Sequence, residues 1–310
     1  MKNILIAGGS GFIGRALTTV LINKGNTVSW LSRKGSQESP VNQIEWDWIN
    51  QNVDLSFLTK FDTLINLAGV NIGEKRWNKK RKEEIFNSRV KATEFLFNIL
   101  SNNQHTIQTY ISASGVGYYG AVTGQKLYNE SDDHSNDFLG NLCFQWEQAA
   151  NQFLKLGKRV VILRTGVVLS TESQAFRQLY VLMNLGFGAA LGSGKQYFSW
   201  IHLDDICQIY EMAVRDESCE GVFNAVAPEY LTNYEMVEQF TKYIKKPFFL
   251  PNVPAFIVRI LTGEMSEALL YGSRISSEKL INYGFQFKYA AFHQALTAIL
   301  SGIHAKRNLR

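Results

Sequence analysis

The sequence predicts an α/β protein built on a doubly wound parallel sheet, and three observations lead to this prediction. The chain begins with a short apolar run, a set of closely spaced glycines and an amphipathic helical pattern, in that order. Apolar runs of strand length then alternate with helical patterns as far as Gly166, which is typical of parallel sheets. Small and hydroxyl-bearing residues follow several of these runs, at the edge where such sheets bind ligands. The 310 residues, 45% of them hydrophobic, are enough to bury a full core.

The first strand and the first helix enclose a glycine turn. Residues 4–7 (ILIA) have the length and the branching of a buried parallel strand. Three glycines follow, at Gly8, Gly11 and Gly14. Beyond the first two of them, apolar residues recur at helical spacing: Phe12, Ile13, Ala16, Leu17, Val20 and Leu21. A strand, a glycine turn and a helix are the context that a dinucleotide-binding fingerprint requires.

Each glycine has a distinct physical role in such a turn. Gly8 allows the tight turn, Gly11 lets backbone N–H groups approach a pyrophosphate, and Gly14 lets the helix lie close to the strand. The helix N-terminus adds unpaired N–H groups and a partial positive charge. The spacing is G-x-x-G-x-x-G rather than G-x-G-x-x-G, so a flexible turn without a ligand is the alternative. The candidate pyrophosphate-binding residues are Gly8, Ser10, Gly11, Phe12, Ile13 and Gly14.

The end of the second predicted strand indicates which dinucleotide the turn would bind. Residues 27–31 predict this strand, and Ser32, Arg33 and Lys34 follow it. NAD-binding folds place an acidic residue about 20 residues beyond the glycines, where it bonds the ribose 2′-hydroxyl. This chain has a hydroxyl and two cations there instead, and arginine can bind a 2′-phosphate through two hydrogen bonds. Ser32 and Arg33 therefore predict NADP(H); a solvated basic turn is the alternative.

Two further stretches add candidate cofactor contacts. Residues 45–48 predict a third, short strand or its edge, and residues 62–66 predict a fourth. Small residues follow the fourth strand, where a cofactor can lie over the strand end. A helix predicted over residues 79–100 carries an arginine among its apolar positions. This arginine is either buried or ligand-binding, or it is simply solvated. The candidates from these stretches are Leu67, Ala68, Gly69 and Arg89.

A cluster of hydroxyl groups follows the next predicted strand. Residues 110–113 predict this strand, and the segment SGVGYYG comes directly after it. A helix is predicted over residues 139–156, and a strand over residues 160–163. Doubly wound sheets bind ligands at these strand ends, so we expect the hydroxyl groups to face a site. The catalytic candidates are Ser114, Tyr118 and Tyr119, and further cofactor contacts are expected at Ser112, Arg164 and Gly166.

The pattern changes after residue 168. We expect residues 1–168 to form the cofactor-binding domain, with segments near 200–228 returning to it, and residues 169–310 to form mainly a smaller C-terminal substrate lobe. Thr232 can cap a helix that carries Glu235 at its third position. The other elements expected in this part are helices over 176–185, 205–214, 234–243, 255–261 and 276–282, and a strand over 222–225.

Composition and charge restrict the partners. The net charge of +5 is spread along the chain without a basic stripe interleaved with aromatics, so no nucleic-acid partner is expected. Three widely spaced cysteines fit a reducing compartment and indicate neither disulfides nor a metal site. No apolar run reaches a membrane-spanning length, and only four apolar residues precede the glycines, too few for a signal peptide. We expect a cytoplasmic monomer or homodimer with a small-molecule substrate and no metal.

The motifs together resemble the extended short-chain dehydrogenase/reductase superfamily. The resemblance rests on the glycine turn, on the segments NLAG and SASGVGYYG, and on WIHLDD and GVFN. The segments GVNIGEKRW, LRTGVVL, GSG, SWIH, GEM and GFQF match one subfamily more closely. This subfamily is nucleoside-diphosphate-sugar epimerase-like and has a C-terminal domain of unknown function. The resemblance covers essentially the whole chain, and it implies an NADP-binding Rossmann fold with a smaller substrate lobe.

The sequence departs from the superfamily where its proton-transfer residues are expected. Members usually pair a serine or threonine with Tyr-x-x-x-Lys, and no tyrosine of this chain has a lysine four residues later. Ser114 matches the serine, whereas Cys143 and Glu147 stand at the tyrosine and lysine positions. A carboxylate raises the pKa of a neighbouring acid instead of lowering it.

Three interpretations of this departure stay open. In the first, Tyr118 or Tyr119 is the acid. In the second, Cys143 transfers the proton; the alternative for Cys143 is that it is only a small buried residue. In the third, the protein binds NADPH without rapid turnover, as a regulatory or scaffold protein. The first two make the chain an oxidoreductase or epimerase acting on a polar, nucleotide-sugar-like substrate. His202 is expected to have a structural role at a strand end.

Overall fold

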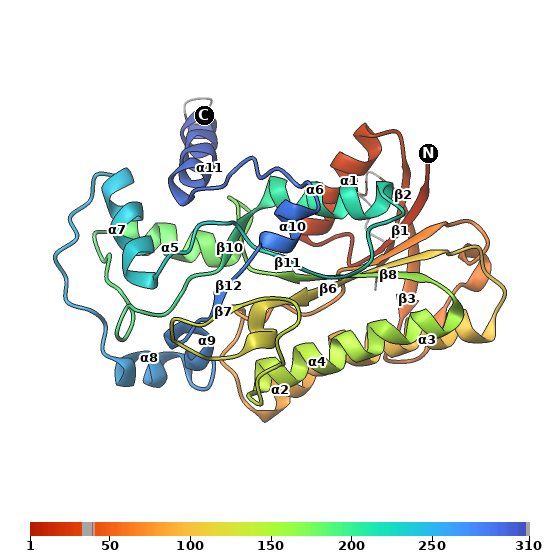
Figure 1. Cartoon of the computed structure of the whole chain (residues 1–310), viewed down its shortest axis with the longest axis horizontal. Helices are drawn as coiled ribbons and strands as arrows, with labels where there is room; N and C mark the ends of the chain where they lie inside the picture. Colours follow the sequence, from red (N-terminus) through yellow and green to blue (C-terminus); the bar gives the residue numbers. More distant parts are fainter. Residues whose placement is uncertain (33–38, 40, 308–310) are drawn as a thin grey trace.

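The computed structural model describes residues 1–32, 39 and 41–307, and an eight-stranded sheet forms their centre (Figure 1). The strand order is β11-β8-β6-β5-β1-β2-β3-β4, and every neighbouring pair is parallel except β3 with β4. The strands are β1 (Asn3–Ala7), β2 (Thr27–Ser32), β3 (Asn42–Asp47), β4 (Asn52–Val53), β5 (Thr63–Asn66), β6 (Thr109–Gly115), β8 (Arg159–Thr165) and β11 (Gly221–Ala225). The predicted Rossmann-type, doubly wound α/β fold is confirmed.

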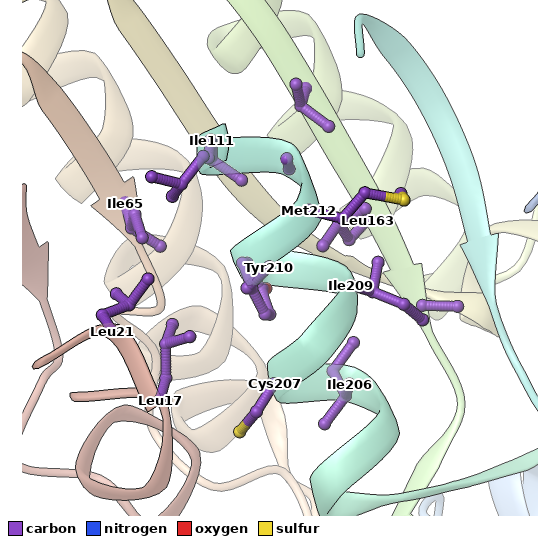
Figure 2. Packing of buried hydrophobic residues seen from close by; sticks show 14 of the residues in the cluster. Leu17, Leu21, Ile65, Ile111, Leu163, Ile206, Cys207, Ile209, Tyr210 and Met212 are labelled. Carbon is purple, nitrogen blue, oxygen red and sulfur yellow. The ribbon is translucent and has the colours of Figure 1, made fainter. Parts of the chain in front are cut away.

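Alternating side chains of the strands serve the two faces of the sheet. In β1, Ile4 and Ile6 pack into one hydrophobic cluster, whereas Leu5 and Ala7 pack into another. Helices α1 (Phe12–Asn23) and α6 (Leu203–Arg215) cover the first face (Figure 1). Figure 2 shows how α6 packs against α1 and the sheet, through the side chains of Leu17, Leu21, Ile65, Ile111, Leu163, Ile206, Ile209 and Tyr210.

Helices α2 (Lys79–Phe86), α3 (Ala92–Asn102) and α4 (Phe138–Asn151) lie on the other face (Figure 1). The single helix predicted over residues 79–100 is interrupted by one π-helical stretch, Asn87–Lys91. Such stretches are rare and occur frequently at functional sites. A 3₁₀ turn at Gln152–Leu156 extends α4, as the predicted helix over residues 139–156 requires.

The remaining elements form the part of the molecule beside the carboxyl ends of the strands (Figure 1). Strand β9 (Val167–Leu169) pairs with β10 (Trp200–His202), and β7 (Leu127–Tyr128) pairs with β12 (Arg274–Ile275). The helices here are α5 (Gln174–Asn184), α7 (Asn233–Tyr243), α8 (Ala255–Thr262), α9 (Ser266–Leu270) and α11 (Phe292–Arg307). Helix α10 (Glu278–Asn282) instead lies on the first face of the sheet, where Leu280 packs in the same hydrophobic cluster as residues of α1 and α6 (Figure 1). Thr232 and Glu235 form the predicted capping box of α7.

Candidate functional site

The glycine turn between β1 and α1 is held by close backbone contacts. Gly8 has a φ of +79°, and a Cβ atom there would lie 2.9 Å from the carbonyl carbon of Leu67. A Cβ atom at Gly14 would lie 2.5 Å from the carbonyl oxygen of Gly9, so only glycine lets α1 lie this close. At Gly11, by contrast, the nearest atom is the carbonyl oxygen of Gly8 at 3.3 Å. The turn is therefore closely packed at Gly8 and Gly14 and has more space at Gly11.

Among the described residues, no side chain caps the N-terminus of α1 next to this turn. Gly11 is the N-cap residue, no side chain caps the helix, and its first turn contains no acidic residue. Arg15 donates a hydrogen bond to the carbonyl oxygen of Ser10 and forms an ion pair with Glu172. Phe12 and Ile13 lie half-buried at the start of the helix, against the core. The first turn thus presents N–H groups and positive potential beside an open glycine.

The end of β5 faces the glycine turn. The fully buried Asn66 is in register with Ala7 of β1; its side-chain oxygen accepts a hydrogen bond from the N–H of Ala68 at 3.1 Å. Its amide nitrogen donates to Thr93 and Tyr110. This network fixes the segment Leu67, Ala68 and Gly69. Asn66 is not among the predicted site residues, although an asparagine that ends an apolar strand is a recognisable signal for such a network.

Arg89, in the π-helical stretch, lies directly behind this segment. Its guanidinium donates to the carbonyl oxygens of Val70 and Ile85, at 3.0 and 3.2 Å, and faces the Trp146 ring. A Cβ atom at Gly69 would lie 2.9 Å from the central guanidinium carbon. Among the described residues no carboxylate pairs with Arg89, and burial lowers its pKa to about 10.

A buried ionic cluster joins the ends of β6, β8 and α4. Arg164 donates from Nε and Nη2 to the two carboxylate oxygens of Glu147, each at 2.8 Å. Ser114 Oγ donates to Glu147 Oε1 at 2.7 Å. The exposed fractions of Ser114, Glu147 and Arg164 are only 5%, 5% and 3%. Ser114 and Arg164 are in register across the sheet, so neighbouring strands bring these groups together.

Tyr119 extends the cluster to the last strand of the sheet. Its hydroxyl accepts a hydrogen bond from Arg164 at 2.9 Å and donates one to Asn224 Oδ1 at 2.7 Å. Asn224 is in register with Arg164 and donates to the carbonyl oxygen of Ser276. Burial raises the pKa of Tyr119 to about 12. The Tyr119 proton is thus engaged within the protein; the part of Asn224 in this network was not anticipated.

Tyr118 has a different environment. The guanidinium carbon of Arg164 lies 3.3 Å from the centroid of the Tyr118 ring, a stacking contact. Burial raises the pKa of Tyr118, against the lowering effect of the Arg164 charge. Cys143 lies nearby in the same hydrophobic cluster, and burial together with the Glu147 charge raises its pKa to about 12. Cys143 is therefore a neutral thiol at physiological pH.

The other predicted residues are distributed around these groups. Ser112 is buried and bonds the Ala113 carbonyl oxygen, and a Cβ atom at Gly166 would lie 2.8 Å from the Ser199 carbonyl oxygen. Ser32 donates to Gln43, whereas Arg33 lies outside the described residues. His202 caps α6 by accepting a hydrogen bond from the Asp204 N–H, and burial lowers its pKa to about 4.

An open cavity of about 350 Å³ adjoins Tyr119. Its walls come from the loop between β6 and α4 and include Tyr128, Asp132 and His134. Within residues 1–32, 39 and 41–307, no helix has both the length and the apolar character needed to cross a bilayer. The same part of the chain contains no group of His, Cys, Asp and Glu side chains that could hold a metal ion.

Comparison with known proteins accords with this architecture. The sequence profile of the NAD dependent epimerase/dehydratase family matches residues 4–225, and that of a domain of unknown function (DUF1731) matches residues 253–299. Epimerase family protein Mb2239 of Mycobacterium bovis is 36% identical over 294 residues, 94% of this chain and 96% of that protein. Epimerase family protein SDR39U1 of Mus musculus is 33% identical, over 96% of this chain and 99% of that protein.

A solved structure shows the same relationship in three dimensions. The crystal structure of human epimerase family protein SDR39U1 (isoform 2) with NADPH has a TM-score of 0.85 and 30% sequence identity. The match covers 96% of this chain and 98% of the human chain. The resemblance to an epimerase-like short-chain dehydrogenase/reductase with a C-terminal domain of unknown function is confirmed. The chain belongs to the NAD dependent epimerase/dehydratase family.

Proposed function

We propose that the protein binds NADP(H) at the β1–α1 turn and acts as an oxidoreductase or epimerase on a polar, nucleotide-sugar-like small molecule. The observation that carries this proposal is that the glycine turn and Ser114 lie at the same edge of the sheet. Strands β1, β5 and β6 are neighbours in the sheet, and their carboxyl ends meet at one edge. A dinucleotide on the turn would therefore extend its reactive end toward β6. The NADPH in the related human SDR39U1 structure supports this assignment.

The residues present fit a dinucleotide. The uncapped N-terminus of α1 and the open face of Gly11 offer hydrogen-bond donors and space for a pyrophosphate. Leu67, Ala68 and Gly69 form the adjoining wall, with the half-buried cation of Arg89 behind them. Such a cation without a carboxylate partner favours an anionic ligand nearby. The choice of NADP(H) over NAD(H) rests on the sequence at Ser32 and Arg33.

NADP(H), when bound, supplies hydride transfer, and the protein must supply the proton transfer. Ser114 directs its proton to Glu147, so its oxygen lone pairs are free to accept a hydrogen bond from a substrate hydroxyl. Arg164 fixes Glu147 in this role through two hydrogen bonds. Tyr119 donates to Asn224, which makes it a structural member of the cluster. Tyr118 is accordingly the proposed proton donor, its ring oriented by Arg164.

A second candidate function is cofactor binding without turnover. The observation that favours it is the replacement of the lysine position by Glu147, whose charge is fully engaged by Arg164. Glu147 supplies no charge that lowers a tyrosine pKa, and burial raises the pKa values of both Tyr118 and Tyr119 by more than the Arg164 charge lowers them. Such a protein would hold NADPH and signal its presence through the substrate lobe.

Hydride exchange separates the two functions. NADPH deuterated on one face of C4 is incubated with the protein and a panel of polar ketones and aldehydes, which accept hydride. In a separate arm, NADP⁺ is incubated with the protein and with sugars, sugar nucleotides and other polar alcohols that are deuterated at the carbon to be oxidised, which donate hydride. An oxidoreductase or epimerase transfers the label with at least one compound, and Ser114→Ala and Tyr118→Phe lower that rate by about 10²-fold while NADPH affinity stays within a few-fold. Retained label with every compound, together with tight NADPH binding, supports the second function. Full exchange rates in both variants would contradict the assigned roles.

A further inference from the structure

Arg274, on β12, has a cationic side chain that no described residue neutralises. It is half-buried, and its Nε atom is fully buried without a hydrogen-bond partner. Within the described part of the chain, its guanidinium donates no hydrogen bond and forms no ion pair. Other arginines of the interior differ: Arg164 pairs with Glu147, Arg159 donates to backbone carbonyl oxygens, and so does Arg89.

Aromatic rings and strand pairing hold Arg274 in place. Its guanidinium lies 4.2 Å from the Tyr230 ring centroid and 5.9 Å from that of Tyr197. Such contacts orient a guanidinium and leave its N–H groups available to donate hydrogen bonds within the plane of the guanidinium. The preceding residue, Ser273, donates from its hydroxyl to the carbonyl oxygen of Gly120 at 3.2 Å. The cation is thus positioned by the fold, at the loop that follows Tyr119.

The surroundings place Arg274 next to the candidate site. Its neighbour Ile275 packs in one hydrophobic cluster with Tyr118 and Tyr119. Arg274 itself lines a narrow cleft at the carboxyl end of β11. Glu229 also lines this cleft, but its carboxylate is engaged by the Phe292 N–H at the start of α11 and by the Gln239 amide. Glu229 keeps its negative charge but forms no ion pair with Arg274, so among the described residues the Arg274 guanidinium has no anion bonded to it.

We propose that Arg274 binds an oxyanion of the substrate, a phosphate or a carboxylate. The inference rests on the proposed function, because it assumes a substrate between the sheet and the C-terminal lobe. A guanidinium can bind either oxyanion through two parallel hydrogen bonds, and the anion would supply the partner that the buried Nε atom lacks. The free volume of the cleft is about 10 Å³, room for about one water molecule. Binding therefore requires Tyr230, which is 37% exposed, to turn outward.

Thermal unfolding with added anions tests the inference. Sodium phosphate and sodium acetate are added separately, at constant ionic strength, to protein saturated with NADPH, which occupies the sites for the cofactor phosphates. At least one anion is expected to raise Tm by binding the native state. Arg274→Gln should weaken that binding about ten- to a hundredfold. Arg274→Lys should weaken it less, because lysine keeps the positive charge but cannot donate two parallel hydrogen bonds. Arg177→Gln, at an exposed arginine of α5, should leave it unchanged.

The two arms identify the substrate class. A response to phosphate alone indicates a phosphorylated substrate, and a response to acetate alone indicates a carboxylate. No response to either anion, or an equal response in Arg274→Gln, overturns the inference. If Arg274→Gln does not fold, a crystal structure of the wild-type protein grown with phosphate decides: phosphate at the guanidinium supports the inference, and its absence there overturns it.

NADPH titration of the same samples keeps the two proposals separate. Loss of the anion response with intact NADPH binding overturns this inference alone. Failure of the wild-type protein to bind NADPH contradicts the proposed function, whatever the anions do.

Discussion

The Glu147 carboxylate accepts three hydrogen bonds in the protein interior, two from Arg164 and one from Ser114. Glu147→Gln leaves the Arg164 charge buried without a counter-charge, so we expect the free energy of unfolding to fall by about 3 kcal/mol. Urea denaturation measures the change. Glu217→Gln is the matched control, because Glu217 pairs with Lys2 at the surface and should not alter stability measurably. Equal stabilities of Glu147→Gln and the wild type would show that the buried pair is not the structural centre of the site.

Cys143 allows a direct check on which acid serves the site. Its pKa is raised from 9.0 to about 12, so at pH 8 the native protein should hold it as a thiol. We expect Ellman's reagent to leave Cys143 unmodified in the native protein and to react with all three cysteines in guanidinium chloride. Peptide mass mapping locates the label. Rapid modification of native Cys143 would restore it as a proton-transfer candidate.

At the scale of elements, the glycine turn makes a prediction about paired alanine variants. A Cβ atom at Gly14 would press on the Gly9 backbone at 2.5 Å, whereas one at Gly11 meets only the Gly8 carbonyl oxygen at 3.3 Å. Gly14→Ala is therefore expected to cost about 1–3 kcal/mol of stability, the usual range for overpacking, and Gly11→Ala clearly less. Thermal and urea unfolding of both variants provide the comparison. The opposite ranking would mean that α1 is not seated as the structure shows.

The elements differ in how far the sequence predicts them. Strand β1 and helix α1 follow from local patterns, because each element is amphipathic or apolar throughout and the glycines separate them. The π-helical stretch at Asn87–Lys91 does not, because its apolar spacing continues that of the flanking helices. Strands β7 and β12 are only two residues long and pair across about half the chain, so no local pattern marks them. Helix α11 lies outside the predicted elements, although its buried residues Phe292, Leu296 and Ile299 do recur at helical spacing.

The sequence indicates which polar residues end the strands, but it does not indicate which of their side chains are in contact. Ser114 and Arg164 are candidates because each follows a predicted strand, and the register of β6 and β8 places them side by side. Their shared partner Glu147 comes from a helix on one face of the sheet, and no sequence spacing encodes which buried charges meet. Asn66 and Asn224 are fully buried amides at strand ends, whose networks appear only once the strand order is known.

At the scale of the whole molecule, cofactor choice is expected to depend on charge at the end of β2. Arg33 supplies a guanidinium where NAD-binding folds carry an acid. A charge-assisted hydrogen bond of about 1.5–3 kcal/mol corresponds to roughly a ten- to hundredfold preference for NADPH. Arg33→Ala should weaken NADPH binding by that factor and leave NADH binding nearly unchanged. The preference should also shrink as salt rises. If neither Arg33→Ala nor added salt reduces the preference for NADPH over NADH, the 2′-phosphate binds elsewhere.

The central claim is that the whole α/β frame serves to hold NADP(H) at the β1–α1 turn, and calorimetric titration tests it most directly. The wild-type protein, Gly11→Val and Gly124→Val are each titrated with NADPH. A Cβ atom at Gly124 would have no atom of the described residues within 4 Å, which makes that variant the control for a glycine replacement. The structure predicts binding by the wild type and by Gly124→Val, and none by a folded Gly11→Val, whose side chain would occupy the open face of the turn. Unchanged NADPH affinity in Gly11→Val would contradict the account.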